Sequence, residues 1–168
     1  RQGQLPIWNL YEMSGKPLLA NFQTGAFYPL NAILLLNPFS LSWSVFILMQ
    51  LILGGMFMFL YLKSLNLSPP AIVLGTTSWI FSGFAIAWLE WGNIGHTALW
   101  LPLILVAVNK FLISRSKKEE IIWFFVLLFS LCSSFFAGHL QTFFYLAIFV
   151  GIYTLALWIV NGRKISKF

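Results

Sequence analysis

Five long apolar stretches constrain the fold of this chain more than any other feature. Because an α-helix rises about 1.5 Å per residue, about 20 residues cross a hydrocarbon core of about 30 Å. Apolar residues make up 60% of the chain and charged residues only 8%, which leaves too little polar surface for a soluble globule. The sequence therefore predicts an all-α, polytopic transmembrane helix bundle in which residues 1–40 form a proline-broken loop outside the bundle. The five predicted helices cover residues 41–62, 71–89, 98–113, 121–137 and 140–160.

Other folds fit these stretches less well. The third and fourth stretches, taken alone, are short enough for buried helices of a soluble protein, but five in series with charged residues between them favour a membrane. A β-barrel would need alternating apolar and polar residues, whereas these runs are continuous. Small residues inside the stretches predict close packing between helices. They are Gly54, Gly55, Gly75, Ser78 and Gly83.

The basic residues are divided unevenly between the two ends of the predicted helices. Of ten Lys and Arg, only Arg1 and Lys16 fall on the side of residues 1–40. The other eight are Lys63, Lys110, Arg115, Lys117, Lys118, Arg163, Lys164 and Lys167. This bias predicts a multi-pass membrane protein with residues 1–40, 90–97 and 138–141 outside and the C-terminal end cytoplasmic. The net charge of +6 then needs no nucleic-acid partner, because the basic residues face an anionic lipid leaflet.

The two ends and the single cysteine allow two further expectations. The chain begins on Arg1 rather than Met and stops at Phe168, just after the fifth stretch. We expect a fragment of a larger protein, with a preceding helix that delivers Arg1 to the outside. Cys132 is the only cysteine, so an internal disulfide is excluded, and its position within a helix predicts a packing role.

Residues 1–40 combine prolines with aromatic and amide side chains. The prolines break regular structure into short pieces, and Trp and Tyr suit the headgroup zone of a membrane. One interpretation is an interfacial loop that only caps the bundle. The other is a loop that faces a substrate, with amides and a carboxylate available to hydroxyl-rich or phosphate ligands. The substrate-binding candidates here are Trp8, Asn9, Tyr11, Glu12, Asn21 and Gln23.

A second group of candidates lies at the predicted outer helix ends. Glu90 ends the second stretch, where a carboxylate can simply reach up to water. Alternatively, Glu90 and His96 converge with His139 on a divalent cation or on a phosphate, although their spacing is no recognised ligand pattern.

The turn between the fourth and fifth stretches carries Gly138, His139, Leu140 and Gln141. An imidazole at membrane depth is costly unless it faces protein or water, which favours a cavity-lining role over a hydrogen bond between helices. We therefore expect one polar cavity under the loop. Its expected members are Trp8, Asn9, Glu12, Glu90, His96, His139 and Gln141.

Residues 8–11 (WNLY), 14–21 (SGKPLLAN) and 23–31 (QTGAFYPLN) form an ordered series of motifs near the start of the chain. They resemble the W-N-P-Y, G-x-P-L-x-A-N and Q-x-G-x-F-Y-P-L-N patterns in the first external loop of the bacterial YfhO-like membrane proteins. Leu10 departs from the usual proline. Ser82-Gly83-Phe84, which follow Phe81, are similar to the F-S-G motif, and residues 138–141 (GHLQ) with Tyr145 are similar to the G-H-x-Q motif.

This resemblance implies a glycosyltransferase of the GT-C superfamily that takes its sugar from a polyprenyl-phosphate carrier and transfers it to a glycan or polymer of the cell envelope. Such chemistry would use a general base and a divalent cation, Mg²⁺ or Mn²⁺. In the family an early acidic residue of the first loop acts as base or metal ligand. This chain has no Asp, so the catalytic residue is expected upstream of Arg1. The alternatives are a transporter or flippase of the same lipid-linked sugar, and a noncatalytic scaffold for a separate transferase.

Overall fold

The computed structural model describes residues 7–11, 14–36 and 38–165. It confirms an all-α bundle with five helical segments long and apolar enough to cross a membrane, at Phe39–Ser64, Pro69–Ala87, Asn93–Ile113, Lys117–Phe136 and Leu140–Val160. Three of them are single helices, α1 (Phe39–Ser64), α6 (Lys117–Phe136) and α7 (Leu140–Ile165). The other two are each made of two shorter helices.

The second and third segments are broken inside the apolar region. The second consists of α2 (Pro69–Ile80) and α3 (Gly83–Ala87), and Ser82 caps α3 by accepting a hydrogen bond from the Ala85 amide at 3.2 Å. The third consists of α4 (Asn93–Ala98) and α5 (Leu101–Ile113). A proline in the first turn of α5 has no backbone N–H to donate to the preceding turn, so α4 and α5 do not form one continuous helix.

The predicted loop over residues 90–97 is wrong. A short 3-10 helix, η3 (Leu89–Trp91), leads into a turn at Gly92, and α4 begins immediately afterwards at Asn93. Gly92 adopts a φ of 70°, which glycine tolerates at low cost, and the chain re-enters the bundle at once. His96 and Thr97 are consequently buried rather than exposed to water.

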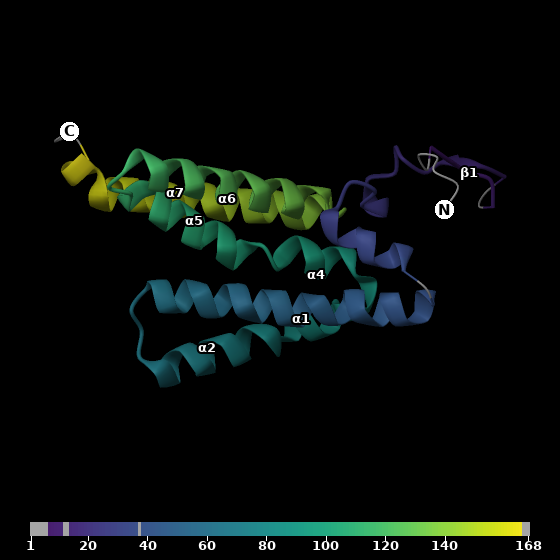
Figure 1. The fold of residues 1–168 in the computed structure, drawn as a ribbon, viewed down its shortest axis with the longest axis horizontal. Helices are drawn as coiled ribbons and strands as arrows, with labels where there is room; N and C mark the ends of the chain where they lie inside the picture. Colours follow the sequence, from purple (N-terminus) through teal and green to yellow (C-terminus); the bar gives the residue numbers. More distant parts are fainter. Residues whose placement is uncertain (1–6, 12–13, 37, 166–168) are drawn as a thin grey trace.

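The broken third segment forms the centre of the bundle. In Figure 1, α4 and α5 lie between the α1–α2 pair and the α6–α7 pair. Over an apolar stretch of 18 residues in each segment, buried residues make up 56% in the third segment but at most 28% in any other. Ile104 and Ala107 of α5 are fully enclosed. The remaining helices therefore keep faces that a lipid bilayer would cover.

Small residues bring α1 and α2 together, as the sequence predicts. A side chain added at Gly55 would press on Ile80, and one at Gly75 would collide with Leu62. Gly83 differs, because no atom lies within 4 Å of the place its Cβ would take. Its role is therefore at the break between α2 and α3 rather than in helix packing.

The N-terminal segment covers one end of the bundle, which we call the loop end. Two short antiparallel strands, β1 (Trp8–Asn9) and β2 (Lys16–Pro17), lie farthest out, as Figure 1 shows. Two 3-10 helices follow, η1 (Phe22–Thr24) and η2 (Pro29–Leu35). The opposite end, where the turns 65–68 and 114–116 lie, is the basic end.

Candidate functional site

A groove of about 720 Å³ runs between the second segment and α7. Its two walls come from α2–α3 and α7, and parts of α1, α4 and the start of α5 complete it. Most of the lining is apolar, including Met58, Trp79 and Phe149. Such a lining suits a hydrocarbon chain, because hydrocarbon surface is unfavourable in water.

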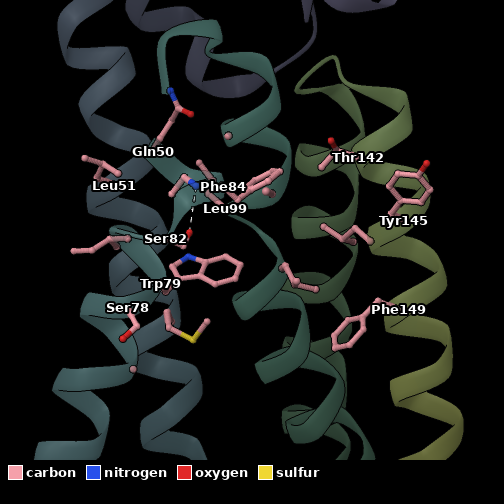
Figure 2. Close-up of a pocket in the computed structure, with 18 residues that line it drawn as sticks. Gln50, Leu51, Ser78, Trp79, Ser82, Phe84, Leu99, Thr142, Tyr145 and Phe149 are labelled. Carbon is pink, nitrogen blue, oxygen red and sulfur yellow. Dashed lines mark hydrogen bonds between the residues drawn. The ribbon is translucent and has the colours of Figure 1, made fainter. Parts of the chain in front are cut away.

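Three polar side chains of the groove, Gln50, Thr142 and Tyr145, lie toward the loop end. Figure 2 shows Gln50 on one side and Thr142 with Tyr145 on the other at its upper end, while Phe149 lies lower. Ser82 also lines the groove. The upper end of the groove is therefore the more polar one, while its lower part is mainly apolar and contains Ser78.

Both broken segments contribute their breaks to this groove. Ser82 lies at the break between α2 and α3, and Leu99 lies at the break between α4 and α5. Irregular backbone at membrane depth is tolerated where it is buried in protein or lines a cavity. Both helix breaks within the apolar segments therefore lie at this groove.

The sequence candidates His139 and Gln141 are each one hydrogen bond away from the groove. His139 Nδ1 lies 2.7 Å from Thr142 Oγ1, and Gln141 Nε2 donates to Tyr145 OH at 3.1 Å. Because the Thr142 amide also donates to His139 Nδ1, at 3.3 Å, this nitrogen is the unprotonated one. These two side chains thus position groove residues and do not themselves line the groove.

The turn that carries them is packed under the N-terminal segment. Gly138 adopts a φ of 100°, and a Cβ there would lie 3.1 Å from the carbonyl oxygens of Phe22 and Gln23. The Phe22 ring also meets Phe135 edge-on at 4.9 Å. Gln23 therefore approaches the turn through its backbone, while its side chain is exposed.

His96 belongs to a buried network instead of a binding site. Its side chain is fully enclosed, and its ring stacks on Phe46 at 3.9 Å. Nε2 lies 2.9 Å from the Phe46 carbonyl, and Nδ1 lies 2.8 Å from Tyr28 OH. Trp100 Nε1 donates to the same Tyr28 hydroxyl at 3.2 Å.

The carbonyl can only accept, so His96 is protonated on Nε2 and Tyr28 donates to Nδ1. Every polar atom of the three side chains then has a partner. Burial raises the pKa of Tyr28 well above its usual value, against the smaller opposing effect of the Trp100 hydrogen bond. Tyr28 stays neutral and fastens the N-terminal segment to the bundle.

The remaining candidates do not share one cavity. Asn9 and Asn21 accept hydrogen bonds from the backbone amides two residues ahead, which closes local turns. Trp8 and Tyr11 are exposed. Glu90 is exposed and lines a separate depression of about 550 Å³ with Trp43.

The expected members of the predicted polar cavity thus lie in several separate places. Glu12 lies outside the described residues. Of the other expected members, Trp8, Asn9, Glu90, His96, His139 and Gln141, none lines the groove. Within the described part of the chain, no group of three or more His, Cys, Asp or Glu is placed to hold a metal ion. Both nitrogens of His96 are engaged, so the proposed convergence with Glu90 and His139 has no structural support.

Two important residues were not identified from the sequence. Tyr28 occurs in an aromatic-rich loop, and nothing local indicates its partner in α4. Gln50 did carry a signal, because it is the one amide in the apolar run 41–62, and polar residues inside membrane helices are commonly functional. Comparisons of the chain with protein-family models, curated proteins and solved structures gave no match.

Proposed function

We propose that this chain is part of a membrane glycosyltransferase of GT-C type that binds a polyprenyl-phosphate-linked sugar in the groove. One observation carries the proposal. The two helical motifs that resemble the YfhO-like family, at residues 82–84 and 138–145, are far apart in sequence, yet they meet at the groove. Ser82 and Phe84 line one wall and Tyr145 lines the other, while Gln141 is bonded to Tyr145.

The shape of the groove supports a lipid-linked substrate. From Gln50 to Met58, both of which line it, α1 advances about 12 Å. That length accommodates a segment of extended hydrocarbon chain, and the polar end then receives the head. A head bound at this polar end would lie near the loop end of the bundle, where an acceptor from the cell envelope would arrive.

In the proposed reaction, an acceptor hydroxyl oxygen forms a bond to the anomeric carbon of the sugar. The bond from that carbon to the phosphate oxygen breaks, and the polyprenyl phosphate leaves with the electron pair. A general base takes the hydroxyl proton. A divalent cation would stabilise the leaving phosphate, but its ligands would have to come from outside the described residues, which place no group of three or more His, Cys, Asp or Glu to hold one. No carboxylate of the described residues lines the groove, so the proposed base lies outside them.

The proposal places the protein in a bacterial cell membrane with the loop end outside. Lys63, Lys110 and Arg115 support this orientation, because all three lie at or near the basic end and basic residues favour the cytoplasmic side. The absence of a carboxylate from the described groove lining keeps a transporter or flippase of the same lipid as a second candidate, since transport needs the groove but no base.

Filling the groove tests the proposal in the full-length protein. Ala85 lines the groove, whereas Ala147 is exposed on α7 and does not. In liposomes supplied with polyprenyl-phosphate sugar, Ala85→Phe should abolish sugar transfer and Ala147→Phe should leave it intact. Movement of the lipid across the bilayer without transfer would favour the flippase. Equal transfer by both variants would contradict a role for the groove.

A further inference from the structure

Trp79, on the groove wall formed by α2, has a hydrogen-bond donor without a partner. Its side chain is half-buried and lines the groove, and Figure 2 shows the indole projecting from α2 into it. Within the described part of the chain, Nε1 donates to no acceptor. The nitrogen is not sealed inside the protein, since the buried unpaired atoms of the described residues are Gln50 Oε1, Thr76 Oγ1 and Ser133 Oγ. A ligand in the groove can therefore reach this N–H.

A free indole N–H is unusual at this depth of a membrane protein. Indole N–H groups that leave water usually donate to an acceptor, as Trp100 does to Tyr28, because hydrocarbon supplies no replacement. Gly54 of α1 also leaves space beside the nitrogen. Trp79 Nε1 is the atom nearest to the place of a Cβ at residue 54, at 3.4 Å, so a longer side chain there would cover the N–H.

Ser82 supplies a second free donor close to Trp79. Its Oγ accepts from the Ala85 amide at 3.2 Å, and because this bond uses only a lone pair, the hydroxyl hydrogen stays available. The hydroxyl donates to no acceptor of the described residues. The Ser82 amide donates to the Trp79 carbonyl at 3.3 Å, and Figure 2 shows the hydroxyl just above the indole nitrogen. Two unused donors therefore adjoin at the break between α2 and α3.

The pair lies where the more polar upper end of the groove passes into the apolar lower part. In Figure 2 both residues lie below Thr142 and above Phe149. No Asp or Glu of the described residues lines the groove and would repel an anion, and no Lys, Arg or His lines it either. An oxygen of the ligand is therefore held here by neutral donors. In a lipid-linked sugar whose chain occupies the lower part, the group at this junction is the phosphate.

We propose that Trp79 Nε1 and Ser82 Oγ donate hydrogen bonds to the phosphate of the lipid-linked sugar. The inference rests on the groove being the lipid site proposed above, and it adds the place of the phosphate. Hydrogen bonds to an ionised acceptor are stronger than those to a neutral one. In the proposed reaction the phosphate gains charge as its bond to the anomeric carbon breaks, so two fixed donors stabilise the leaving group. The sugar then lies above the pair, toward the loop end.

Photolabelling of the full-length protein in lipid nanodiscs tests this assignment. Three probes share one diazirine-bearing prenyl chain and differ in the head, which is a methyl phosphodiester, a methyl ether or a glucoside. Wild-type protein should bind the phosphodiester about tenfold more tightly than the ether. Mass spectrometry should map the labels to groove residues such as Phe149. Excess inorganic phosphate should not displace the phosphodiester, because the chain supplies part of its affinity.

Two replacements each remove one donor hydrogen. Incorporation of 3-benzothienylalanine at Trp79 puts sulfur in place of the N–H and keeps the bicyclic ring, so the preference for the phosphodiester should fall severalfold. Ser82→Gly should have the same effect, because glycine is well tolerated as a helix cap but has no hydroxyl. The matched control is 3-benzothienylalanine at Trp43, which lines the separate depression and not the groove. It should leave the preference unchanged.

The outcomes separate this inference from the function on which it rests. Equal binding of phosphodiester and ether to wild-type protein, with labels in the groove, overturns the phosphate site and leaves the lipid site intact. A preference that survives both replacements does the same. No groove label from any probe overturns both proposals. Replacements that weaken the glucoside and not the phosphodiester would assign the donors to the sugar, and displacement by inorganic phosphate would assign them to the free ion; either result contradicts the inference.

Discussion

Removal of a single hydroxyl group tests how the N-terminal segment is held on the bundle. In Tyr28→Phe the aromatic ring remains, but His96 Nδ1 loses its donor and Trp100 Nε1 loses its acceptor. Both atoms belong to buried side chains. Each buried group left without a partner costs about 1–3 kcal/mol, whereas hydrogen bonds inside a membrane protein average about 0.6 kcal/mol. We expect the two losses together to lower the free energy of unfolding by about 2 kcal/mol.

Reversible unfolding in mixed micelles measures this change, and Tyr11→Phe is the matched control because Tyr11 is 98% exposed. Hydrogen exchange should also accelerate over residues 21–36, since Tyr28 fastens this segment to α4. Its raised pKa gives a second signature with a definite sign. A group that is harder to deprotonate in the folded state contributes stability below its unfolded pKa of about 10, and this contribution is lost as the pH rises above that value. The stability difference between wild type and Tyr28→Phe should therefore shrink in strong alkali.

The reasoning fails if Tyr28→Phe is as stable as Tyr11→Phe to within about 0.5 kcal/mol, the range of ordinary surface substitutions. A loss of stability without faster exchange over residues 21–36 would also contradict it. In that case the network would stabilise the helices and not the attachment of the segment.

Three further predictions concern orientation, the α6–α7 turn and the groove. Gln23 and Ser116 are both exposed. A cysteine introduced at Gln23 should react with an impermeant reagent added outside, whereas one at Ser116 should react only after permeabilisation. The reverse pattern would invert the proposed topology. Gly138→Ala should destabilise the protein by about 1–3 kcal/mol, because Gly138 has a φ of 100° and a Cβ there would press on two carbonyl oxygens. Gly151→Ala is the control, because there is open space around Gly151, and it should leave the stability unchanged. Melting curves of the two variants measure the difference. His139→Ala should lower sugar transfer at nearly unchanged stability by removing the partner of a groove hydroxyl, and activity that falls only in step with the amount of folded protein would make His139 structural.

The helices were predictable because transfer into hydrocarbon depends mainly on composition over about 20 residues. The start of the third segment was not, since Asn93, His96 and Thr97 have the composition of a loop. In the structure their polar atoms are satisfied internally, as in the 2.8 Å bond from Thr97 Oγ1 to the Asn93 carbonyl. His96 depends on Tyr28, which is 68 positions away. Local sequence cannot distinguish a polar residue that needs water from one whose partner lies elsewhere in the fold.

The break at the groove wall is a second feature that local sequence does not predict. Gly83 and its neighbour Ser82 are small residues in an apolar run, a pattern that predicts helix packing. The structure instead ends α2 before them and starts α3 with Ser82 as its cap. This break lies at a groove wall that also contains Phe84, so the motif shapes the wall of the groove where a continuous helix would present a uniform apolar face. Whether small residues pack or break a helix is decided by what lies opposite them, and here nothing lies within 4 Å of the Cβ position of Gly83.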